Sequence, residues 1–187
     1  MNVLRITRQY AVQRALYHLE ILHKGSDGIA RPIAYRLDDS GLLGGKYPNA
    51  PHCADVSYGG RTLTSDCTGF ALYAAGIARN QPGYKGSRGE SLNTDAVLDD
   101  AHGQRAFFCP VKPGEALRGD LVVMRGKYLL KVRVKAGHIE MLLRPPTLDF
   151  KGMTIGCSPR FGRDTAIGVG YIWSDACEIV RPLNYID

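Results

Sequence analysis

The chain has 187 residues, of which 44% are hydrophobic and 22% charged, the length and balance of a soluble globular protein with one core. It has no apolar stretch of membrane-spanning length, and residues 1–8 lack the features of a secretory signal peptide. The net charge of +6 suits an acidic partner such as nucleic acid, an anionic envelope or an anionic polymer, without choosing among them. We predict one domain over residues 1–187, made in the cytoplasm.

The five cysteines are widely spaced, and no Cys-x-x-Cys pair occurs. This pattern argues against a zinc ribbon and a thioredoxin-like motif. The odd count leaves at least one thiol free, and we predict neither a metal nor an organic cofactor. The cysteines are Cys53, Cys67, Cys109, Cys157 and Cys177.

Near the start, residues 8–23 have the apolar spacing of an amphipathic helix, with Thr7 as a possible N-cap and Gly25 at its end. We expect His18 in this helix to be a surface or boundary residue. Residues 25–66 are interrupted by many glycines and prolines, which predicts a long loop. Because long loops in compact domains are often functional, we place this one against the mouth of a site at Cys67.

The stretch from Ser65 to Arg79 carries the strongest local signal. Ser65 or Asp66 can cap a helix whose remaining residues are almost all apolar, as in a helix buried on every side. Cys67 would then lie in the first turn, where unpaired N–H groups and the helix dipole favour a nucleophilic thiolate. The alternative is a buried structural cysteine that begins a helix.

The second half of the chain changes from helical to strand periodicity. A short helix is predicted at 94–101, capped by Asn93 and ending near Gly103. Strands are then predicted at 119–124, 128–135, 138–143, 153–157, 168–173 and 178–180. Helices followed by an antiparallel sheet define the α+β class. We expect 128–135 to be a single half-exposed strand with a basic outer face of Lys131, Arg133 and Lys135, whose alternative role is that of a solvated edge.

A thiolate nucleophile needs a base, usually a histidine. Of the five histidines, only His138 opens a predicted strand directly after a glycine. Cys67 at a helix start and His138 at a strand start can meet if the helix packs across the sheet. The alternative for His138 is a boundary histidine with a satisfied hydrogen bond.

Three motifs in this order resemble the NlpC-type cysteine peptidases of bacterial cell walls. Residues 66–70, Asp-Cys-Thr-Gly-Phe, resemble the family's Asp-Cys-Ser-Gly-Phe signature. Residues 119–122 and 137–139 resemble its Gly-Asp-Leu and Gly-His-Val/Ile strands. Helix 8–23 and residues 35–45, with a tyrosine and a diglycine, are also similar to the family, so the resemblance covers roughly residues 8–160.

The resemblance implies a papain-like fold with Cys67 as nucleophile and His138 as general base. It implies a substrate among the amide bonds of peptidoglycan stem peptides, with no nucleic acid partner, and it admits an immunity or delivery protein. Phage lysis enzymes and type VI secretion amidase effectors of this broad group also lack ordinary signal peptides. They reach the wall by lysis-linked release or by injection, which would reconcile a wall substrate with this N-terminus.

The chain departs from the family at the third catalytic position. Gly156 occupies the place of a polar residue, often histidine, on the strand after the catalytic histidine. We expect a main-chain carbonyl at Gly156 or Cys157 to orient His138, with the Ser158 hydroxyl as the rival. Type VI amidase effectors are similar in having a cysteine in this strand.

Two other functions stay open. One is a non-catalytic module that binds the wall on the same fold, for which the altered third position is the support. The other is a papain-like toxin that attacks a protein amide, and its Cys67–His138 pair would look the same.

Overall fold

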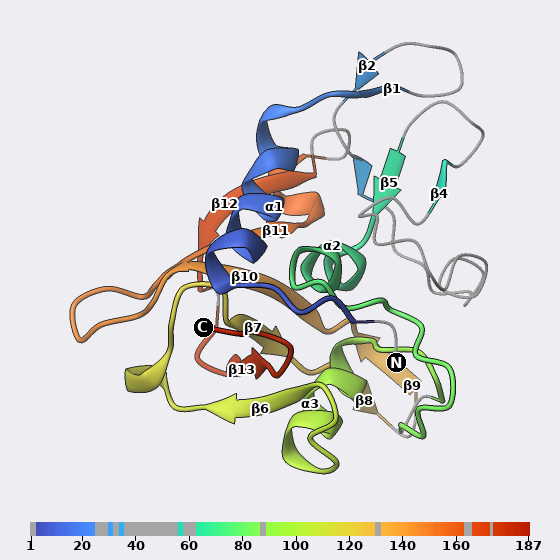
Figure 1. Cartoon of the computed structure of the whole chain (residues 1–187), viewed down its shortest axis with the longest axis vertical. Helices are drawn as coiled ribbons and strands as arrows, with labels where there is room; N and C mark the ends of the chain where they lie inside the picture. The colour runs from blue at the N-terminus through green and yellow to red at the C-terminus, as the bar shows by residue number, and fades with distance from the viewer. Residues whose placement is uncertain are drawn as a thin grey trace.

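The computed structural model describes residues 3–24, 30–31, 34–35, 56–57, 63–86, 89–129, 132–162, 166–172 and 174–187. Three α-helices pack against a six-stranded antiparallel sheet (Figure 1), which confirms the predicted α+β class. The helices are α1 (Arg8–Glu20), α2 (Cys67–Ala74) and α3 (Thr94–His102).

The main sheet has the strand order β12-β11-β10-β7-β13-β6. Its strands are β6 (Phe108–Val111), β7 (Leu121–Met124), β10 (His138–Arg144), β11 (Met153–Cys157), β12 (Ile167–Tyr171) and β13 (Glu178–Pro182). Two 3-10 turns are described, η2 (Pro113–Glu115) and η3 (Pro159–Phe161). Shorter strands form separate small sheets: β1 (His23–Lys24) with β2 (Ala30–Arg31), β3 (Ala34–Tyr35) with β5 (Leu63–Ser65) and β4 (Val56–Ser57), and β8 (Lys127–Leu129) with β9 (Val132–Lys135).

Helix α1 begins as predicted and ends earlier. The Thr7 hydroxyl accepts a hydrogen bond from the N–H of Tyr10, but the helix stops at Glu20, and Leu19 and Leu22 are exposed. His18, expected at a surface or boundary position, is buried, with its ring edge-on to Tyr73. The aromatic surroundings account for this burial.

Helix α2 is buried on all sides, as its composition predicts. The caps predicted for α2 and α3 are also present, and of the two candidates at α2 it is Asp66 that accepts the N–H of Gly69. Asn93 caps α3 in the same way. Helix α2 is followed by Gly76, whose positive φ of 72° is accessible to glycine and turns the chain away.

The two faces of the main sheet carry separate clusters. Ile139, Met141 and Ile155 pack with the helices in the larger core, and we call this side the inner face. Val122 and Leu142 belong to a smaller cluster on the outer face. Since side chains alternate along a strand, His138 and Glu140 share the outer-face parity with Leu142.

Two strand predictions differ from the structure. Residues 128–135 do not form one strand; β8 and β9 pair with each other as a hairpin inserted between β7 and β10. The alternation of apolar residues fits either arrangement, and no glycine or proline marks the turn. Strand β6 is absent from the predicted strands, and its Pro110 is compatible with a strand because β6 lies at the edge of the sheet, where proline is tolerated.

Several predicted features lie outside the described residues. These are most of the loop 25–66, including His52, Cys53 and the family-like stretch 36–45, together with Lys131. Among the residues that the structure does describe, no helix has the length and apolar character needed to cross a membrane.

Candidate active site

The candidate nucleophile begins α2. Asp66, directly before Cys67, is held by two contacts: its Oδ1 accepts the Gly69 N–H at 2.7 Å, and its Oδ2 lies 2.8 Å from Nη1 of Arg79. Cys67 itself is 4% exposed. As the first helical residue it has a backbone N–H with no intrahelical acceptor, next to the positive end of the helix dipole.

His138 opens β10 at the end of the sheet where β7 finishes, and it pairs there with Met124. Gly137 makes this approach possible. A Cβ atom on Gly137 would collide with the Thr94 side chain and would lie 2.7 Å from the Met124 carbonyl oxygen. The glycine of the Gly-His motif therefore has a packing role, which is to let the start of β10 lie against α3 and β7.

The structure brings Cys67 and His138 together. The His138 ring makes a hydrogen bond with the Glu140 side chain and has the Cys67 side chain as its other neighbour. Burial lowers the pKa of His138, but these two neighbours raise it more, to about 9. His138 is then positively charged at neutral pH.

Glu140 is a site residue that the sequence analysis missed. Its Oε1 lies 2.9 Å from Nε2 of His138. Its Oε2 accepts the hydroxyl of Thr154 at 2.6 Å, and the side chain is fully buried. A lone acid in the apolar run 138–143 was the signal that could have found it, since unpaired carboxylates are rarely buried.

Gly156 provides the space for Glu140. In the register of β10 and β11 it faces Glu140 across the strands, and a Cβ atom at this position would collide with Cγ of Glu140 and lie 2.9 Å from Cδ. The glycine that occupies the family's third catalytic position therefore leaves space for an acid on the neighbouring strand. The orienting group comes from the same strand as the histidine.

The structure adds a group at the third position, because the carboxylate of Glu140 contacts His138. A main-chain carbonyl at Gly156 or Cys157 as the orienting group stays a prediction. The buried Cys157 thiol donates to the carbonyl of Ser65 at 3.3 Å, which connects β11 to the last residue of β5. The rival Ser158 hydroxyl accepts the N–H of Arg160 in η3.

Arg160 completes the cluster from η3. Its Nη2 lies 2.8 Å from Oε1 and 2.7 Å from Oε2 of Glu140. Cys67, His138, Glu140 and Arg160 thus form a line of neighbouring side chains, with two candidate anions and two cations in alternation. Among the described residues, no group of three or more His, Cys, Asp or Glu side chains is arranged to hold a metal ion.

The Gly-Asp-Leu motif lies at the start of β7 and has a supporting role. Asp120 is fully buried, accepts the N–H of Leu117, and pairs with Arg181 at 2.8 Å. Gly119 has a φ of 94°, and a Cβ atom there would lie 3.2 Å from Cβ of Arg8. These contacts fix the strand against which the start of β10 pairs.

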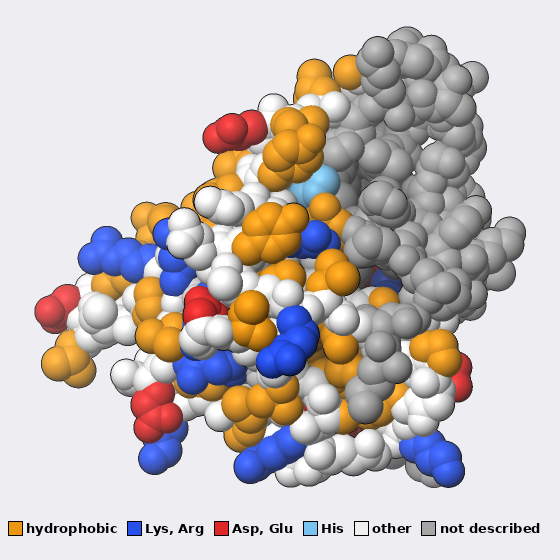
Figure 2. Space-filling model, in the orientation of Figure 1, with side chains coloured by type: hydrophobic (Ala, Val, Ile, Leu, Met, Phe, Trp, Pro, Cys, Tyr) orange, Lys and Arg blue, Asp and Glu red, His pale blue; other side chains and the backbone are white. Residues whose placement is uncertain are grey.

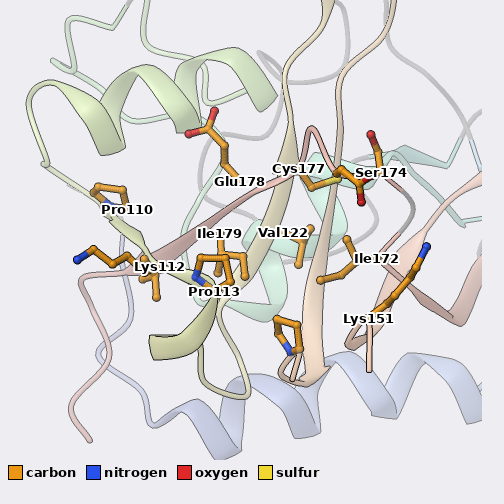
Figure 3. Close-up of a pocket in the computed structure, with 13 residues that line it drawn as sticks. Pro110, Lys112, Pro113, Val122, Lys151, Ile172, Ser174, Cys177, Glu178 and Ile179 are labelled. Carbon is orange, nitrogen blue, oxygen red and sulfur yellow. The ribbon is translucent and has the colours of Figure 1, made fainter. Parts of the chain in front are cut away.

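A separate cavity of about 540 Å³ lies on the outer face of the sheet (Figure 3). Its lining includes Ile179 and Val122, which pair across β13 and β7, and Val122 pairs in turn with Glu140. Cys177 at its edge interacts electrostatically with Glu140 and Arg160, and burial raises the pKa of this thiol to about 11. None of Cys67, His138, Glu140 and Arg160 lines the cavity, so it is separate from the candidate site.

Of the basic side chains expected on the outer face of 131–135, only that of Lys135 is described, and it is exposed. On the face that Figure 2 shows, basic side chains are spread among apolar and uncharged ones. This view gives no single cationic patch.

Comparisons with family models, curated proteins and solved structures give no significant match. The resemblance to NlpC-type peptidases therefore stays a prediction, and the function is argued from the geometry of the site.

Proposed function

We propose that this protein is a cysteine hydrolase that cleaves amide bonds in the stem peptides of bacterial peptidoglycan. The observation that carries the proposal is the contact of Cys67, at the start of a buried helix, with His138, which also contacts Glu140. A nucleophile, a base and a group that orients the base are the parts that this chemistry needs. The choice of peptidoglycan rests on the resemblance of the three motifs.

In the proposed reaction, the Cys67 sulfur attacks the carbonyl carbon of the amide. In this step the N–H of Cys67, which has no acceptor within the helix, donates to the oxygen that becomes negative. His138 then protonates the leaving amine as the C–N bond breaks, leaving a thioester on Cys67. Next, His138 removes a proton from water, whose oxygen attacks the thioester and releases the acid and the free thiol.

Glu140 holds the imidazole in one orientation and tautomer, as an acceptor at the second ring nitrogen does in such sites. Its presence weakens the case for a non-catalytic wall-binding module, which was supported only by the missing side chain at Gly156. We place the site of action at the cell wall, reached by injection or lysis-linked release.

Digestion of purified peptidoglycan, with mass spectrometry of the released fragments, tests the proposal. Wild type should release stem-peptide fragments, and Cys67→Ala should release none while remaining folded, because only the nucleophile is removed. Cys109→Ala is the matched control. Cys109 is also a free cysteine, but it lies on the edge strand β6, which is separated by β13 and β7 from the strand β10 that carries His138.

Two results would replace the proposal with one of the open alternatives. Sedimentation of wild type with peptidoglycan without any turnover would identify a binding module. Intact peptidoglycan together with Cys67-dependent cleavage of a protein amide would identify a papain-like toxin.

A further inference from the structure

The buried carboxylate of Glu140 has two cationic neighbours, and only one of them keeps its positive charge throughout the proposed reaction. A buried carboxylate is costly unless it is paired. His138 loses its positive charge whenever it protonates a leaving group. Arg160 keeps its charge throughout, because a guanidinium does not release its proton at accessible pH. Arg160 is therefore the constant partner of Glu140.

The residues around Arg160 leave space for its side chain and provide a ring on which it stacks. Its guanidinium carbon lies 4.6 Å from the centre of the Phe161 ring. On β12, a Cβ atom at Gly170 would lie 2.6 Å from Nη2 of Arg160, and one at Gly168 would collide with Phe161. Two glycines on an edge strand thus leave room for the arginine and for the ring on which it stacks.

We propose that Arg160 is a positioning residue that acts through Glu140: it fixes the carboxylate against His138 and favours release of the proton that these two residues share. The inference rests on the hydrolase function proposed above. Release of that proton changes the pair from neutral to negative. A nearby cation stabilises the negative state, whichever of the two residues held the proton.

This role has a consequence for catalysis. Without Arg160 the pair would hold its proton more tightly, and His138 would be a weaker acid toward the leaving amine. The buried carboxylate of Glu140 favours the protonated form of His138. Arg160 would weaken this effect, so that His138 can still release its proton.

Among the described residues, other groups near the pair come from three elements and from the turn before β13. Cys67 of α2 contacts His138, Thr154 of β11 donates its hydroxyl to Glu140, and Val122 of β7 is apolar. Cys177, before β13, interacts with Glu140 and Arg160. The pKa of its thiol is raised to about 11, so the thiol stays neutral through most of the pH range in which His138 is titrated. A Cys67→Ala background removes the remaining thiol from the titration.

The test is an NMR titration of the His138 ring in that background, assigned by its loss in His138→Gln. Arg160→Met should move the midpoint to higher pH by about one unit or more, as expected for the loss of a charge within several ångströms. Arg160→Lys keeps the charge and should leave the midpoint near that of the parent. Arg144→Met is the matched control, because Arg144 lies on β10, is exposed, and stacks on Phe150.

A midpoint in Arg160→Met that stays unchanged or moves to lower pH would overturn the inference. If this variant fails to fold, Arg160→Gln carries the test, since it keeps a hydrogen-bond donor without the charge and should also raise the midpoint. The readout does not depend on hydrolysis. An unshifted midpoint in an enzyme that digests peptidoglycan overturns this inference alone, whereas the predicted shift in a protein without turnover overturns only the proposed function.

Discussion

Replacing His138 with Gln should remove a pH-dependent part of the stability. The pKa of His138 is raised from 6.5 to about 9 in the folded protein, so the protonated ring stabilises the fold relative to the unfolded chain. At 1.36 kcal/mol per pKa unit this contribution is about 3 kcal/mol. It is fully present below pH 6.5, falls as the pH rises, and is lost once the pH has passed through 9.

The assay is urea unfolding of wild type and His138→Gln at pH 6 and pH 10. The free energy of unfolding of wild type should fall between these pH values by about 3 kcal/mol more than that of the variant. His102→Gln is the control, because His102 is exposed and pairs with Glu178 at the surface. Parallel pH dependences for wild type and His138→Gln would refute the claim that the contacts with Cys67 and Glu140 keep this ring protonated.

Three further results are expected. Cys67 should react with iodoacetamide at pH 7 faster than Cys109, because reactive cysteines lie beside cationic groups such as the charged His138; equal labelling rates by peptide mass spectrometry would count against this. Gly156→Ala should cost about 1–3 kcal/mol in urea unfolding, because the new methyl group overlaps Glu140, and the cost should shrink in a Glu140→Ala background. Glu140→Gln should slow peptidoglycan hydrolysis about a hundredfold, whereas Cys157→Ala should stay within about tenfold, a barrier change of about 1.4 kcal/mol. The reverse order would return the third position to Cys157.

The parts of the fold that local signals specify could be predicted well. Asp66 and Asn93 cap their helices because a short polar side chain can accept the N–H three residues on. Strand β11 has the predicted bounds, and β10 extends one residue beyond them, up to the double proline. The contact of Cys67 with His138 followed from placing each at the start of its element.

The parts that depend on register could not be predicted in the same way. Glu140 lies two residues after His138 in the chain, but its burial depends on a glycine of the next strand and on Arg160 beyond that strand. No periodicity in the sequence reveals that combination. The β8–β9 hairpin escaped prediction because a strand-like alternation does not say whether the strand folds back on itself.

The proline in β6 has a consequence for how this protein behaves at high concentration. Exposed sheet edges are templates for pairing with other chains, and an open-ended fibre needs both edges of each molecule. Pro110 has no N–H to offer to an incoming strand, which weakens the β6 edge. Strand β12 has no proline, and it exposes Val169 and Tyr171. Association by strand pairing is therefore expected to join two β12 edges and stop at a closed dimer. Light scattering should show larger assemblies for Pro110→Thr than for wild type.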